Sequence, residues 1–124
     1  VKNQCFIYFD YIIILYYFFV LGATTAMVPI GLAFKMPMGT YGRLAPRSSL
    51  SMKGIDIGAG VIDADYRGEI KVVVINRTRA SYTFKRGDKI CQLIPEKIDV
   101  PMLRELASLP PTDRGHGGFG STGN

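Results

Sequence analysis

The sequence predicts an all-β fold with one short helix. Glycine and proline are frequent, with 14 and 7 copies among 124 residues, as is typical of turn-rich β proteins. Short stretches of β-branched and aromatic residues recur between turn signals, which favours a sandwich, barrel or jelly roll. Segments of helical and strand character do not alternate, so parallel βαβ folds are disfavoured. The length fits one domain, and a hydrophobic content of 48% excludes wholesale disorder.

Residues 1–26 differ in composition from the rest of the chain. Residues 5–20 are almost wholly apolar and aromatic, and Asp10 interrupts them. Three interpretations remain open: a signal peptide or membrane anchor, a buried strand, or sequence from a mis-joined exon. Periodicity does not separate these for a short apolar run. We therefore expect an atypical N-terminal segment at 1–26, a β domain at 27–111 and a Gly-rich lid at 112–124.

Each later element is expected from its local pattern. We expect an edge or bent strand within 27–36, and a turn at Met38-Gly39 before a strand at 41–45. A polar loop should follow at 46–49. The predicted strands after it are 69–76, the clearest because it is β-branched, then 81–84 and 89–94, with Pro95 ending the last. Residues 101–109 are the one helix candidate, because Pro101 suits a first helical position and two prolines follow at 110–111.

The composition excludes several classes of metal, disulfide and catalytic site. One histidine and two cysteines exclude a zinc finger and a disulfide scaffold. The motifs CxxC, HExxH and GxxxxGK[ST] are absent. The whole net charge of +5 lies beyond residue 26, because Lys2 and Asp10 cancel in the first 26 residues. That charge fits an anionic partner, and it fits equally well a basic domain with no such partner.

Four segments could carry chemistry, and each has a structural alternative. Residues 60–68 hold two aspartates on one side of an extended chain, which suit a general base or a capped turn. Residues 45–50 hold an arginine and two hydroxyls, which suit phosphate or a capped loop. Residues 114–123 suit phosphate and a stacked base or a disordered tail. Residues 87–93 read as a hairpin entering a core strand, with Cys91 packed inside.

Together these segments resemble the trimeric dUTPase family. APRSSL at 45–50, GVIDADYRGE at 60–69, KRGDKICQLI at 85–94 and RGHGGFGSTG at 114–123 resemble the second to fifth motifs of that family. The motifs keep their order and spacing, and the resemblance covers residues 27–124. It implies a β-clip or distorted jelly roll, a homotrimer with shared sites, and hydrolysis of dUTP to dUMP and pyrophosphate with Mg²⁺ held by substrate phosphates and water.

The resemblance also implies roles for individual residues. Asp63 would activate the attacking water, and residues 60–66 would recognise uracil and deoxyribose. A second group would bind phosphates, and the tail would close over the substrate. The substrate-binding residues implied are Arg47, Ser48, Ser49, Gly60, Val61, Ile62, Asp63, Tyr66, Lys71, Gln92, Arg114, Phe119, Gly120, Ser121 and Thr122.

The chain departs from the family at its first motif, which residues 1–26 replace. Asp10 does not match that motif, so it receives no metal-binding role. An alternative interpretation is therefore a catalytically impaired fragment that acts as a nucleotide-binding module. A nucleic-acid partner is not expected, because the basic residues form no run with interleaved aromatics. A membrane is not expected either, unless residues 1–26 are an anchor. The resemblance implies an intracellular protein of unspecified compartment.

Overall fold

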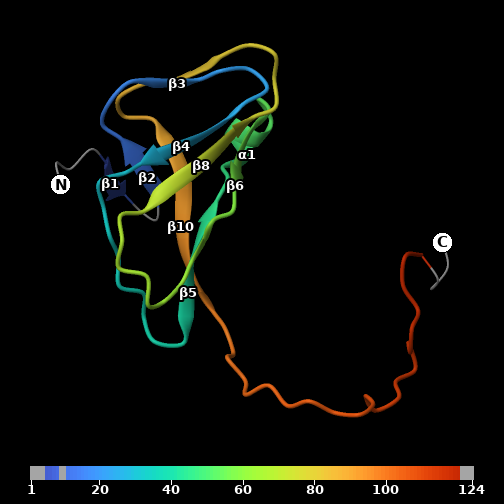
Figure 1. Cartoon of the computed structure of the whole chain (residues 1–124). Helices are drawn as coiled ribbons and strands as arrows, with labels where there is room; N and C mark the ends of the chain where they lie inside the picture. Colours follow the sequence, from blue (N-terminus) through green and yellow to red (C-terminus); the bar gives the residue numbers. More distant parts are fainter. Residues whose placement is uncertain (1–4, 9–10, 121–124) are drawn as a thin grey trace.

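The computed structural model describes residues 5–8 and 11–120 and confirms an all-β fold with a short helix. A body of antiparallel strands is followed by an extended C-terminal stretch that leads away from it (Figure 1). The elements are β1 (Cys5–Tyr8), β2 (Tyr11–Ile14), β3 (Phe18–Val20), β4 (Thr25–Pro29), β5 (Thr40–Ala45), α1 (Ser48–Ser51), β6 (Ile55–Gly58), β7 (Val61–Ile62), β8 (Lys71–Asn76), β9 (Tyr82–Phe84) and β10 (Lys89–Lys97).

The strands form three sheets among the described residues. The largest has the order β1-β2-β10-β5-β7, and its long central strand β10 is visible beside β5 in Figure 1. A second sheet has the order β4-β8-β6, and a third pairs β3 with β9. Every pairing is antiparallel. The inward side chains make one hydrophobic core, in which Val72, Val74 and Ile90 are fully buried.

The apolar N-terminal run contributes strands to this body. Ile12 and Ile14 of β2 are fully buried, and β2 pairs with β10. β4 pairs with β8, so it joins the sheet that also holds β6. β4 also crosses the expected boundary after residue 26, and the division of the chain into segments stays a prediction. None of the described helices is long and apolar enough to cross a membrane.

The predicted helix at 101–109 is wrong. These residues adopt irregular structure and are exposed throughout. A helix of about two turns is marginal without a surface to pack on, and the extended stretch offers none in its own chain (Figure 1). The described helix is instead α1, which begins within the segment expected as a loop at 46–49.

Strand limits also differ from the expectations. β10 continues through Pro95 to Lys97, because only β5 pairs with it there and proline is tolerated on an unpaired edge. The strand expected within 27–36 ends at Pro29. The strands predicted at 41–45, 69–76 and 81–84 are confirmed as β5, β8 and β9, with ends shifted by one or two residues. The burial predicted for Cys91 is confirmed.

Candidate functional site

The segment that carries Asp63 is fixed against β5 by its glycine. Leu44 N donates to Gly60 O at 2.7 Å, and β7 continues the pairing with Gly42 opposite Ile62. Gly60 has a φ of +95°, and a Cβ there would lie 2.7 Å from Leu44 O. Only glycine fits both this backbone conformation and this close approach. The glycine therefore sets where the following turn begins.

That turn presents Asp63 to a cavity. Tyr66 N donates to Asp63 O at 3.1 Å, which closes the turn, and the Asp63 side chain is exposed. The cavity has a volume of about 360 Å³. We call it the Asp63 cavity, and its lining residues are Met27, Val61, Ile62, Asp63, Tyr66 and Lys71. The fold thus brings together five of the predicted site residues, and Gly60 lies just before them.

The Tyr66 ring in this cavity is held in place. Its hydroxyl donates to Glu69 O at 3.0 Å, and the Glu69 carboxylate accepts from Gly31 N at 2.8 Å. A Cβ at Gly68 would lie 2.5 Å from the Tyr66 hydroxyl, so the ring occupies the space above that glycine. Tyr66 as a whole residue is 43% exposed.

A second cavity lies at α1, the start of β10 and β9. Its volume is about 150 Å³. We call it the Arg47 cavity, and its lining residues are Arg47, Ser49, Leu50, Lys53, Tyr82, Phe84, Asp88 and Lys89. Three cations face one carboxylate, and Asp88 Oδ2 already accepts from Lys85 N at 2.8 Å. The positive excess suits an anion such as phosphate.

Arg47 is anchored in this second cavity. Its Nη1 donates to Lys89 O at 3.0 Å, and its guanidinium carbon lies 5.4 Å from the centroid of the Tyr11 ring. The predicted Ser49 lines the same cavity. Ser48 is exposed on α1, and Gln92 is half-buried opposite Ala45 and Tyr11 in the sheet. Neither Ser48 nor Gln92 lines either cavity.

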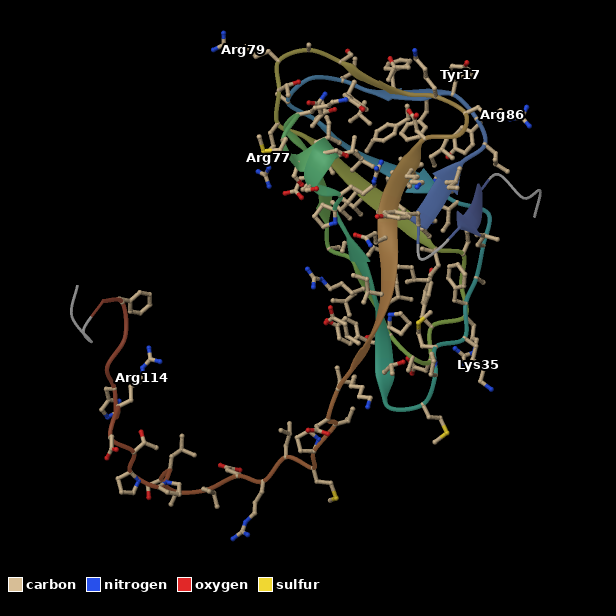
Figure 2. All side chains as sticks on the ribbon, turned by 180° about the vertical axis from the view of Figure 1, so that it is seen from behind. Tyr17, Lys35, Arg77, Arg79, Arg86 and Arg114 are labelled. Atoms are coloured by element: carbon tan, nitrogen blue, oxygen red, sulfur yellow. The ribbon has the colours of Figure 1, made fainter. Side chains whose placement is uncertain are left out.

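The C-terminal stretch from residue 99 to residue 120, which we call the arm, lies away from both cavities. Figure 2 shows Arg114 far from the strands, where its Nε donates to Gly117 O at 2.7 Å within the arm itself. Phe119 is fully exposed and has a φ of +53°, and Gly120 follows it. The predicted Ser121 and Thr122 lie outside the described residues. The chain thus does not bring its own arm to its own cavities.

Ionisable groups also link the end of β10 to β5, just before the arm. The Glu96 carboxylate accepts from the Tyr41 hydroxyl at 2.6 Å and from Arg43 Nη1 at 2.9 Å. These bonds hold the pKa of Glu96 below its ordinary value, with the Tyr41 bond the larger cause. Ile98 N then donates to Gly39 O at 3.0 Å. Beyond that bond the arm begins.

Sequence reasoning did not single out Tyr11, Lys53 or Lys89. Lys53 closely follows the motif segment at 45–50, and Lys89 lies within the segment at 85–94, so both positions were an available signal. Tyr11 lies in the ambiguous apolar run, and only the pairing of β2 with β10 places it beside Lys89. Among the described residues there is no group of three or more histidine, cysteine or acidic side chains that could hold a metal ion.

Known proteins resemble this chain in sequence. The family model described as dUTPase matches residues 7–123. The deoxyuridine 5'-triphosphate nucleotidohydrolase of Fowl adenovirus A serotype 1 is 57% identical over 99 residues, which are 79% of this chain and 56% of the relative. That of Camelpox virus (strain CMS) is 49% identical over 108 residues, 87% of this chain and 74% of the relative. The chain spans little more than half the length of the adenovirus relative.

Solved structures show the same fold. The Staphylococcus bacteriophage 80alpha dUTPase with dUPNHPP superimposes with a TM-score of 0.83 at 24% identity, covering 100% of this chain and 95% of that chain. The native EIAV dUTPase gives 0.69 at 21% identity, covering 86% and 95%. At such identities the likeness concerns the fold, and it confirms the predicted distorted jelly roll. With the model match over nearly the whole chain and relatives at 49–57% identity, the chain belongs to the dUTPase family.

Proposed function

We propose that this chain hydrolyses dUTP to dUMP and pyrophosphate. The observation that carries the proposal is the exposed Asp63 carboxylate at the rim of a cavity shared with the fixed Tyr66 ring. Asp63 accepts a proton from the attacking water, and the water oxygen bonds to phosphorus as the link between the α- and β-phosphates breaks. The protein has to position the proton acceptor and the water, and it forms no covalent bond to the substrate in this step.

Two kinds of recognition support this assignment. In the Asp63 cavity, backbone groups of residues 60–66 lie at a turn that glycine holds in place, and they recognise uracil while Tyr66 packs on the sugar. In the Arg47 cavity, the cationic lining suits the phosphates, with Ser48 and Gln92 nearby. The activity for which the adenovirus and camelpox relatives are named agrees with both.

A complete site takes parts from several copies of the chain. The two cavities share no lining residue, and the arm that carries Arg114, Phe119 and Gly120 leads away from the body (Figure 2). We therefore propose a homotrimer in which the arm of one copy closes over cavities of others. The exposed apolar side chains of Val100, Met102 and Leu103 on the arm support packing against a neighbour.

Mg²⁺ enters this proposal through the substrate. The described residues offer no protein cage, and Mg²⁺ commonly binds substrate phosphates while it keeps several waters. A structural Mg(II) ion is named for a mutant dUTPase from phage phi11 of S. aureus. When bound, the ion neutralises phosphate charge as the leaving pyrophosphate forms. Because dUTP is an intracellular nucleotide, we expect the chain to act inside the cell.

The proposal is tested by comparing Asp63→Asn with Asp65→Asn. Asp65 is the matched control, because it is an exposed carboxylate in the same turn that does not line the cavity. Loss of a general base lowers turnover by about 10²–10⁴-fold, so Asp63→Asn should release pyrophosphate from dUTP that much more slowly and still bind dUTP.

The Asp65 variant should keep the parent rate. Equal rates for the Asp63 variant and the parent would refute the role of Asp63. A parent chain that binds dUTP and releases no pyrophosphate would refute the hydrolysis. The mass of the assembly, measured by light scattering, tests the trimer separately.

A further inference from the structure

The Tyr11 ring lies close to two of the cations that line the Arg47 cavity. The Lys89 ammonium nitrogen lies 4.5 Å from the centroid of the Tyr11 ring, and the Arg47 guanidinium carbon lies 5.4 Å from it. Both distances fall within the range in which a cation is attracted to an aromatic ring. Arg47 and Lys89 are also joined directly, because Arg47 Nη1 donates to Lys89 O at 3.0 Å. One ring therefore organises two of the three cations that line this cavity.

An irregularity in β10 explains why Lys89 reaches this ring. β2 pairs with β10 with Tyr11 opposite Gln92, and a bulge lies between Lys89 and Cys91. Because of the bulge, Lys89 is opposite Ile13, which lies two residues from Tyr11 in β2. The Lys89 side chain is therefore on the same face of the sheet as the Tyr11 side chain. A regular ladder would place Lys89 on the other face, since a shift of one residue moves a side chain across the sheet.

The extra residue of the bulge is Ile90, which is fully buried in the core. A bulge typically re-aims a side chain in this way. The position of Lys89 at the cavity is thus fixed by the backbone on one side and by the Tyr11 ring on the other. A lysine side chain that is already held in position loses less conformational entropy when it binds a ligand.

We propose that Tyr11 is a positioning residue and that Lys89 is a further ligand for the polyphosphate chain of a nucleotide. Arg47 and Lys89 together would bind neighbouring phosphate groups in the Arg47 cavity, with Tyr11 holding both cations toward it. This proposal rests on the proposed function for its nucleotide. The anion site itself is a separate matter, because binding of an inorganic polyphosphate requires no hydrolysis.

The test uses inorganic tripolyphosphate as the probe and measures its binding to the whole chain by calorimetry. Lys89→Gln removes the cation, and we expect its affinity to fall on the order of tenfold, as for loss of one hydrogen bond to a charged group. The matched control is Lys85→Gln, an exposed lysine in the neighbouring turn that does not line the cavity. The control should bind within about twofold of the parent, since an exposed charge away from the site is well screened.

Tyr11→Leu and Tyr11→Phe separate positioning from packing. Leucine removes the ring, and we expect tripolyphosphate affinity and the KM for dUTP to worsen by roughly fivefold, the size of a partly exposed cation–ring contact. Phenylalanine keeps the ring and should restore parent values of both, while kcat changes little in either variant. Thermal unfolding checks the fold, and if Tyr11→Leu does not fold, the Tyr11→Phe and Lys89→Gln results decide.

Three results would overturn the proposal. Equal weakening in Lys89→Gln and Lys85→Gln would reduce the effect to net charge. A folded Tyr11→Leu with parent affinity would remove the positioning role, and so would a Tyr11→Phe as weak as Lys89→Gln. Failure of the proposed function looks different: the parent would release no pyrophosphate from dUTP, while loss of tripolyphosphate binding in Lys89→Gln would still support the anion site.

Discussion

Gly60→Ala is the substitution whose effect the structure specifies most closely. Gly60 has a φ of +95°, and a Cβ there would lie 2.7 Å from Leu44 O. Gly87 provides the matched control, because its φ is +94° and a Cβ there would meet nothing within 4 Å. The two alanine variants therefore carry the same backbone strain, and only one carries a collision with the backbone of a neighbouring strand.

The magnitudes follow from these two terms. A left-handed conformation costs a residue with a side chain about 1–2 kcal/mol, so we expect Gly87→Ala to lose about that much unfolding free energy. Gly60→Ala must in addition displace Leu44 O, which disturbs the 2.7 Å bond from Leu44 N to Gly60 O. An overpacked contact and a weakened hydrogen bond together add about 2 kcal/mol.

The assay is urea unfolding of both variants and the parent at one chain concentration, because assembly makes apparent stability depend on concentration. Pyrophosphate release from dUTP is measured beside it. Turnover should fall further in Gly60→Ala, since the displaced turn carries Asp63. Equal unfolding free energies for the two variants would refute the reasoning, because the contact with Leu44 O would then cost nothing.

Two further predictions concern buried and ionisable groups. Asn76→Ala should lower the unfolding free energy by about 2–4 kcal/mol, measured by urea titration. Asn76 is 1% exposed, and its Nδ2 donates to Val20 O at 3.0 Å and to Ala80 O at 2.8 Å. A loss no larger than that of an alanine substitution at an exposed position would contradict this. Glu96 has a folded pKa below its ordinary 4.5, so its contribution is full above that value and is lost as pH falls through the folded pKa. Glu96→Gln should therefore show a smaller acid-side loss of stability, and parallel pH profiles for variant and parent would contradict the role of its two hydrogen bonds.

Strands with a clear local pattern could be predicted from the sequence. β8 alternates buried and less buried residues along a β-branched run, and its pattern alone indicates a half-buried strand. The limits of β10 could not be predicted in this way. Pro95 ends a strand when partners flank both sides, and whether a partner is present depends on where β2 stops. Local composition holds no information on that tertiary fact.

The same contrast between local pattern and tertiary contact applies to the site residues. The motif around Asp63 can be recognised from the sequence because glycine, aspartate and tyrosine lie close together in it. Tyr11 and Lys89 are 78 positions apart, and the contact between them arises from strand pairing and a bulge. The helix expected at 101–109 fails for a related reason. Its proline signals are correct for a helix start and stop, and the packing surface that a short helix needs is absent from its own chain.

The arm contributes little to the stability of its own chain. After the bond from Ile98 N to Gly39 O, the arm's backbone and side-chain hydrogen bonds join arm residues to one another, such as Gly117 N to Arg114 O. A change in the arm thus leaves the hydrophobic core of its own chain intact. Natural selection can adjust the sequence and length of this stretch without drawing on the narrow stability margin of the strands. Under the proposed trimer, arm variants should therefore fold normally and differ in turnover.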